Sequence, residues 1–167
     1  MEKISNRIYS VGVNDHDKVL FEGLWPIPYG VSYNSYLVVD EKVALIDTVE
    51  CGFEEEYLAN IDKVLGGRNI DYLVVNHMEP DHSSLVAYML EKHPELQIIA
   101  NAKTVPMLKG YYKTPEDKIK VVGLKICLIH EFLQGQLLHI FFRLFPCWLA
   151  EFRILIDGVK GCRQRAF

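Results

Sequence analysis

The chain has 167 residues, of which 50% are hydrophobic and 24% are charged. This balance is typical of one globular domain and excludes a disordered or collagen-like chain. The formal net charge of −4 predicts no basic surface for nucleic acid or for an anionic membrane. The four cysteines form no CxxC pair and the first residues carry no apolar run, so we expect reduced thiols, no signal peptide and a cytoplasmic location.

The first fifty residues predict paired strands. Apolar residues bounded by turn signals indicate short strands over 6–12 and 19–25, the second ended by Pro26. Alternating side chains then predict a hairpin over residues 32–49, with its tight turn at residues 40–42. This part of the chain therefore favours an antiparallel arrangement.

From residue 54 onward, helices and strands alternate. Residues 54–65 place an apolar stripe at helical spacing, begin with three glutamates and end before Gly66. A short apolar strand over 71–76 follows, of the type that is buried on both faces. The remaining expected elements are a helix from Ser83 or Ser84 to Lys92, a strand over 96–101, a helix over 102–112 broken near Gly110, and a strand over 117–122. Together these elements predict an α/β fold in which helices cover a sheet.

The composition changes after Val122. Residues 1–122 carry a net charge of −7 and use mainly lysine, whereas residues 123–167 carry +3 and use mainly arginine. The apolar blocks of the second part follow neither a helical nor a strand period. A membrane helix is disfavoured, because only 11 uncharged residues separate Glu131 from Arg143. A buried helix or strand pair and a tail read in a shifted frame both remain open, and we expect 1–122 and 123–167 to be separate parts.

The residues with clear chemistry lie in one turn. Residues 76–84 read NHMEPDHSS, directly after the predicted buried strand and before a helix. Alternation in an extended turn sends His77, Glu79 and Asp81 to the same side. One imidazole and two carboxylates suit a metal site. The alternative is a polar turn, in which Asp81 or Ser83 caps a helix and His82 faces solvent.

This H-x-E-x-D-H pattern resembles the metal loop of the metallo-β-lactamase fold, with Glu79 where most members carry histidine. The glutamate is typical of flavodiiron proteins, which are oxygen and nitric-oxide reductases with two irons. Residues 24–49, LWPIPYGVSYNSYLVVDEKVALIDTV, are similar to the N-terminal hairpin of that family. The resemblance runs from about Ile8 to Val122 and implies the N-terminal half of a metallo-β-lactamase-like αββα sandwich.

The resemblance also implies roles for individual residues. His77 and Glu79 would bind one iron and Asp81 the other, while His82 would stay outside the ligand shell. A carboxylate is a harder donor than imidazole, so Glu79 moves the preference from zinc toward iron or manganese. Asp47 is expected either to orient a ligand or to cap the end of its strand.

Family members continue with further ligands and with a flavodoxin-like domain that holds FMN. In this chain His139 lies 62 residues after His77 but in unlike surroundings, and Asp157 ends a strand-like segment. His130 is a further candidate ligand, and no flavin domain fits in the remaining residues. The resemblance therefore predicts a truncated fragment, frame-shifted after about residue 122, that binds metal weakly and folds incompletely.

Three functions remain open. The resemblance implies a diiron reductase that converts O₂ to water or NO to N₂O, works as a homodimer, and takes electrons through FMN from a donor such as rubredoxin or a flavin reductase. The alternative is a zinc-dependent hydrolase of the metallo-β-lactamase superfamily, in which a metal-bound hydroxide attacks an ester or amide. For this chain alone we expect no catalysis, and we expect neither a nucleic-acid nor a membrane partner.

Overall fold

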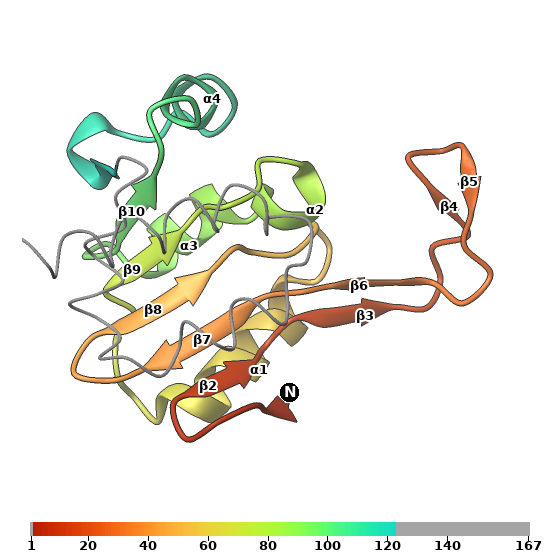
Figure 1. Cartoon of the computed structure of the whole chain (residues 1–167), viewed down its shortest axis with the longest axis horizontal. Coiled ribbons are helices and arrows are strands. Elements are labelled where there is room, and N and C mark those ends of the chain that lie inside the picture. Colours follow the sequence, from red (N-terminus) through yellow and green to blue (C-terminus); the bar gives the residue numbers. More distant parts are fainter. Residues whose placement is uncertain (1, 123–167) are drawn as a thin grey trace, which may run out of the picture. The chain divides into compact units, whose positions relative to one another are not determined.

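A seven-stranded sheet organises the residues that the computed structural model describes, which are 2–122 (Figure 1). Its strands, in spatial order, are β1 (Glu2–Lys3), β2 (Ile8–Ser10), β7 (Tyr36–Val39), β8 (Val43–Ile46), β9 (Tyr72–Val74), β10 (Gln97–Ala100) and β11 (Ile119–Val121). Neighbouring strands are antiparallel from β1 to β8, and β8, β9, β10 and β11 run parallel to one another. The predictions for His130, His139 and Asp157 fall outside the described residues.

The helices connect the parallel strands, as parallel pairing requires. They are α1 (Glu54–Leu65), α2 (Pro80–Ser83), α3 (Val86–Lys92) and α4 (Val105–Tyr112), followed by the short 3₁₀ helix η1 (Glu116–Lys118). Helix α1 has the bounds that its sequence predicts, because three glutamates suit its positive end and Gly66 ends it in the left-handed conformation. No helix within residues 2–122 combines the length and apolarity needed to cross a membrane.

One face of the sheet packs against the helices. The most buried register row on this face joins four strands through Leu37, Leu45, Leu73 and Ile98. Tyr57 and Ile61 of α1 and Met89 of α3 belong to the same apolar core. The sequence predicted such helix-on-sheet layering, and the structure confirms it.

The opposite face of the sheet is apolar as well. Ile8, Val38 and Ala44 share a register row on this face, and Ile46 and Ile99 belong to the next row. All five are buried, yet none belongs to the core that the helices cover. A sheet with two apolar faces is the central layer that a two-sheet sandwich needs.

A slender extension differs from its predicted form. The predicted strand over 19–25 is instead a tight hairpin of β4 (Leu20–Phe21) and β5 (Trp25–Pro26), turning at Glu22 and Gly23. Both turn residues have positive φ, 50° and 70°, and the Leu24 amide donates to the Phe21 carbonyl oxygen at 3.0 Å, as in a type I′ turn. Figure 1 shows this hairpin far from the main sheet, and we call residues 19–29 the finger.

The predicted hairpin over 32–49 is divided between two sheets. Its first part, β6 (Val31–Tyr33), pairs with β3 (Val13–Asp15) and carries the finger, whereas β7 and β8 pair within the main sheet. The division falls where the amides of Val11 and Gly12 both donate to the Ser35 carbonyl. Glycine is required at position 12, since an added Cβ would lie 2.1 Å from the Tyr33 carbonyl oxygen.

Two helix predictions also need correction. The helix expected from Ser83 or Ser84 to Lys92 is two helices, α2 and α3, and neither begins at a serine cap. Helix α2 starts at Pro80, since proline fits the first helical position and follows the extended Glu79. Helix α4 continues through Gly110 to Tyr112 instead of breaking there.

Candidate metal centre

The candidate site is the loop that leaves the end of β9, and we call residues 76–84 the metal loop. Strand β9 lies between β8 and β10, so the loop emerges at the carboxyl end of a parallel strand inside the sheet. Open α/β folds place their ligand sites at such strand ends. Glu79 is the last extended residue before α2 starts, and this change of direction brings the side chains on either side of it together.

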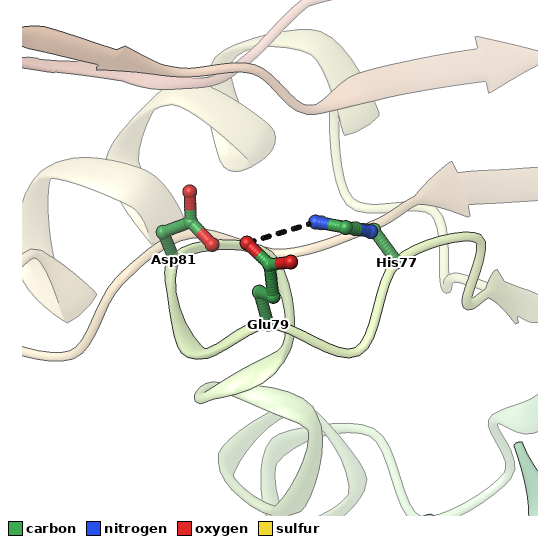
Figure 2. A group of neighbouring side chains, drawn as sticks. All are labelled: His77, Glu79 and Asp81. Atoms are coloured by element: carbon green, nitrogen blue, oxygen red, sulfur yellow. Dashed lines mark ion pairs between the residues drawn. The ribbon is translucent and has the colours of Figure 1, made fainter. Parts of the chain in front are cut away.

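Three predicted ligands converge in this loop. Figure 2 shows the side chains of His77, Glu79 and Asp81 pointing toward one another, and one potential ligand atom from each lies within 4.8 Å of the others. Nε2 of His77 and Oε2 of Glu79 are 3.2 Å apart. The His77 and Glu79 side chains are 49% and 56% exposed, while Asp81 is 16% exposed. A small ion can therefore reach all three from solvent.

The donor chemistry of this group suits a hard divalent metal. One imidazole and two carboxylates offer more oxygen than nitrogen, and carboxylate-rich sets favour iron and manganese over a zinc site built from histidines. Three ligands from one loop supply only part of a two-metal coordination sphere. The residues present therefore fit a metal of the iron type and leave positions for ligands from elsewhere.

His82 lies beside this group. Its ring centroid is 5.4 Å from that of His77 in an edge-to-face arrangement, and its Nε2 is 3.6 Å from Oδ2 of Asp81. Its Nδ1 is buried and has no hydrogen-bond partner within the described residues. His82 is thus not the solvent-facing residue that the alternative of a simple polar turn predicts. Its expected place outside the ligand shell stays a prediction.

Asp47 supports the start of the metal loop. It follows β8, is 3% exposed and has a φ of 54°. Its Oδ1 accepts hydrogen bonds from the backbone amides of Asn76 at 2.7 Å and of His77 at 3.3 Å. Burial raises the pKa of this carboxyl to about 6, although these two hydrogen bonds lower it. Of the two expected roles, the geometry favours orientation of the ligand loop over a cap of its own strand.

Two buried hydroxyl groups hold Asp47 in turn. The Ser35 and Tyr57 side chains donate to the Asp47 carbonyl oxygen at 3.1 and 3.2 Å, and their hydroxyl oxygens are 2.7 Å apart. Burial raises the pKa of Tyr57, so its hydroxyl stays protonated and able to donate. Sequence reasoning missed both residues, because Tyr57 fits the apolar stripe of α1. The signal that could have found Tyr57 was its hydroxyl group, a polar atom on the otherwise apolar stripe of α1.

The far end of the metal loop is tied to the same segment after β8. The amide and hydroxyl of Thr48 donate to the His82 carbonyl oxygen at 2.8 and 3.0 Å. The Ser84 hydroxyl donates to the Val49 carbonyl oxygen at 3.0 Å. Residues 47–49 therefore hold both ends of the metal loop, while its ligand side chains remain accessible.

Comparison with known proteins places the chain in a family. The family model described as "ODP family beta lactamase" matches residues 31–140, which is more than half of the chain. The chain belongs to this family. The ODP match continues past Val122, so similarity to the family does not stop at the change in composition.

The ODP domain here is similar to curated flavodiiron proteins. Flavo-diiron protein FprA2 of Clostridium acetobutylicum is 43% identical over 120 residues, which are 72% of this chain and 30% of that protein. The anaerobic nitric oxide reductase flavorubredoxin of Vibrio vulnificus is 34% identical over 120 residues, which are 71% of this chain and 24% of that protein. The chain therefore spans less than a third of the length of these relatives.

Solved structures agree with the predicted fold. The flavodiiron protein from Giardia intestinalis superposes with a TM-score of 0.69 at 31% identity, covering 74% of this chain and 30% of that chain. The rubredoxin oxygen:oxidoreductase from Desulfovibrio gigas gives a TM-score of 0.67 at 32% identity, covering 72% and 30%. Both confirm that residues 2–122 adopt part of a metallo-β-lactamase-like domain of the flavodiiron kind.

Proposed function

We propose that the metal loop is the first metal-binding segment of a diiron oxidoreductase of the flavodiiron type, with His77, Glu79 and Asp81 as ligands. The observation that carries this proposal is the convergence of three ligand atoms within 4.8 Å on a loop braced by the buried Asp47. The similarity to flavodiiron proteins supports the same reading. In this proposal residues 1–122 form the N-terminal part of the metal domain and residues 123–167 a divergent tail.

Each residue would have a separate task. His77 and Glu79 would hold one metal and Asp81 the other, and the bound pair would supply the reduction of O₂ or NO. Asp47 fixes the backbone of His77 by accepting a hydrogen bond from its amide, so the imidazole is presented in one direction. The buried Ser35 and Tyr57 hydroxyls hold Asp47 in its left-handed conformation. Ligand positions are thus set before a metal arrives.

Electron supply belongs to the same proposal. FMN would deliver the electrons and a homodimer would be the working form. The names of two relatives point to donors of the rubredoxin type, since one is a flavorubredoxin and another a rubredoxin oxygen:oxidoreductase. In this proposal a rubredoxin-type donor would serve a full-length protein of this family. For the 167-residue chain we expect well under one iron per molecule after dialysis, because the metal loop supplies only three ligands.

Metal selectivity tests this proposal against a zinc hydrolase. The full chain, stripped of metal, is titrated anaerobically with Fe²⁺ and separately with Zn²⁺. We expect Glu79→His to raise the affinity for Zn²⁺ relative to Fe²⁺, because imidazole is the softer donor. Glu91→His, at an exposed position of α3, is the matched control and should leave the ratio unchanged.

A second variant tests the location of the site. His77→Ala removes the imidazole of the group and should abolish whatever Fe²⁺ binding the chain has. Equal Fe²⁺ binding by wild type and His77→Ala would show that the metal loop is not the site. An unchanged Zn²⁺ to Fe²⁺ ratio in Glu79→His would remove Glu79 from the ligands.

A further inference from the structure

A third attachment of the metal loop comes from helix α4. The hydroxyl oxygens of Tyr112, the last residue of α4, and of Ser83, the last residue of α2, are 2.7 Å apart. Ser83 is fully buried, and its Oγ lies 3.0 Å from both the Met78 and the Glu79 carbonyl oxygens. One serine hydroxyl therefore links α4 to the backbone at the candidate ligand Glu79.

The direction of these hydrogen bonds follows from their chemistry. Both carbonyl oxygens only accept, so the single proton of Ser83 points toward Met78 and Glu79. Its oxygen is then an acceptor toward Tyr112, which must donate. A chain of hydrogen bonds in one direction runs from the tyrosine to the backbone of the metal loop, and such chains strengthen their members.

This attachment acts where the metal loop changes conformation. Glu79 is extended, with φ of −69° and ψ of 147°, and the helical turn of α2 begins at the next residue. Pro80 has no amide proton, so it brings no backbone donor to this point of the loop. Ser83 reaches back across the turn instead. The Glu79 backbone is thereby held by a side chain whose own position depends on Tyr112.

We propose that Tyr112 is a positioning residue for the metal loop, acting through Ser83 to fix the backbone that presents Glu79. The proposal rests on the proposed function for its consequence in metal binding, but the holding of the loop is a property of the metal-free chain. Asp47 holds the His77 end from the segment after β8, and Tyr112 holds the Glu79 end from α4. Two ligands of one group are therefore set by two different elements.

Tyr112→Phe isolates this role. The ring of Tyr112 packs partly against the core and is kept, so only the donated hydrogen bond is lost. The neighbouring Tyr111 supplies a matched control, because it is 74% exposed and Tyr111→Phe makes the same chemical change one residue away. Ser83→Ala removes both the acceptor of Tyr112 and the donor to the Met78 and Glu79 carbonyls, so the double variant should equal Ser83→Ala, because the Tyr112 hydroxyl acts only through Ser83.

The first measurement needs no metal. Amide hydrogen exchange of the full 167-residue chain reports the loop through His82, whose amide donates to the Glu79 carbonyl at 2.9 Å, and Ser84, whose amide donates to Pro80 at 3.0 Å. We expect these two amides to exchange about tenfold faster in Tyr112→Phe than in Tyr111→Phe, with α1 unchanged. Equal exchange in the two variants overturns the proposal, and so does an acceleration spread evenly over α1 and the loop.

The second measurement uses Co²⁺ as the probe, whose visible absorption reports the number and geometry of ligands. We expect Tyr112→Phe to weaken Co²⁺ binding about tenfold, the lower end for residues that orient ligands, and to alter the spectrum. Tyr111→Phe should match wild type. If His77→Ala loses Co²⁺ and Tyr112→Phe binds as wild type does, the positioning role fails and the proposed function stands. If His77→Ala binds unchanged, the proposed function fails, and the exchange measurement alone decides whether Tyr112 holds the loop.

Discussion

The metal loop and the finger are both irregular segments, but they are held in opposite ways. In the metal loop the candidate ligands His77 and Glu79 are exposed, while buried groups of Asp47, Thr48 and Ser83 hold the backbone. In the finger, Leu24, Trp25 and Tyr29 are 74%, 66% and 92% exposed. Backbone hydrogen bonds within the finger join the Leu24 amide to the Phe21 carbonyl and the Ile27 amide to the Val19 carbonyl.

The root of the finger is an intermediate case. Lys18 pairs with Glu50 and donates to the Tyr33 hydroxyl, which in turn donates to Asp15. The charged groups of this network are partly buried and meet at the buried Tyr33 hydroxyl, so they hold β3 and β6 to the segment after β8. In these two regions the exposure of the side chains and the fixation of the backbone are independent of each other. A segment presents reactive groups in a defined geometry only when buried polar partners hold its backbone.

The largest effect is expected at the root of the finger, from Gly30→Ala. Gly30 has a φ of 77°, and an added Cβ would lie 2.0 Å from the Asp15 carbonyl oxygen. Positive φ and the clash together should lower the free energy of unfolding by about 4 kcal/mol, measured by urea denaturation. Gly110→Ala is the control, since its Cβ meets nothing within 4 Å, and it should stabilise α4 by about 0.5 kcal/mol. Equal stability of the two variants would contradict the geometry.

The next effect tests the support of the metal loop. Asp47→Ala leaves the partly buried Asn76 and His77 amides without their acceptor, and should lower the free energy of unfolding by about 3 kcal/mol. Asp47→Asn keeps an oxygen at the same place and tolerates the positive φ, so its loss should be about 1 kcal/mol. Exchange of the Asn76 and His77 amides should rise in the same order. The reverse order would remove Asp47 from this role.

Lys18→Met should have a smaller effect and lower the free energy of unfolding by about 1 kcal/mol at neutral pH, because the ion pair of Lys18 with Glu50 is partly exposed. Burial raises the pKa of Glu50, but the hydrogen bond and the charge of Lys18, together with the Tyr33 hydroxyl, outweigh burial, and the pKa is lowered. A lowered carboxyl pKa gives stability that is present above the unfolded value of 4.5 and is lost as the pH falls through the folded value.

This prediction is tested by measuring the free energy of unfolding as the pH is lowered. Wild type should lose stability more steeply than Lys18→Met below about pH 4.5, the unfolded value for Glu50. Lys92→Met is a suitable control, because its ammonium group lies over the Tyr88 ring, away from the root. Parallel curves for wild type and Lys18→Met would show that this ion pair does not hold the finger.

The smallest effect is expected at the tip of the finger. Trp25→Ser replaces a side chain that is 66% exposed, so the free energy of unfolding should change by no more than about 0.5 kcal/mol. Tyr57→Phe, in the core, is the contrast and should cost about 1 kcal/mol or more through its lost hydrogen bonds. A large loss for Trp25→Ser would mean that the tip is covered and that the comparison between finger and loop is wrong.

Several features were predictable because neighbours in the sequence decide them. The periodicity of residues 54–65 and the glycines after Leu65 are local, so α1 has its predicted bounds. The strands at β9 and β10 follow from short apolar runs. The grouping of the candidate ligands was predictable as well, because His77, Glu79 and Asp81 lie within five residues. The chain is not extended throughout, however, since Asp81 lies in the first turn of α2.

The tertiary structure alone decided the supports of that loop. Asp47 reaches Asn76 across 29 residues, Tyr112 reaches Ser83 across 29, and Ser35 reaches the Asp47 carbonyl across 12. The transfer of the chain between sheets at Ser35 and the tight turn at Glu22 also depend on pairing with distant strands. Local spacing determines which side chains stand on one face, but a hydrogen bond between remote segments exists only after the sheet has set their register. The candidate ligands were therefore readable from the sequence, Asp47 was readable only as one of two alternatives, and the supports from Ser35, Tyr57 and Tyr112 were not readable at all.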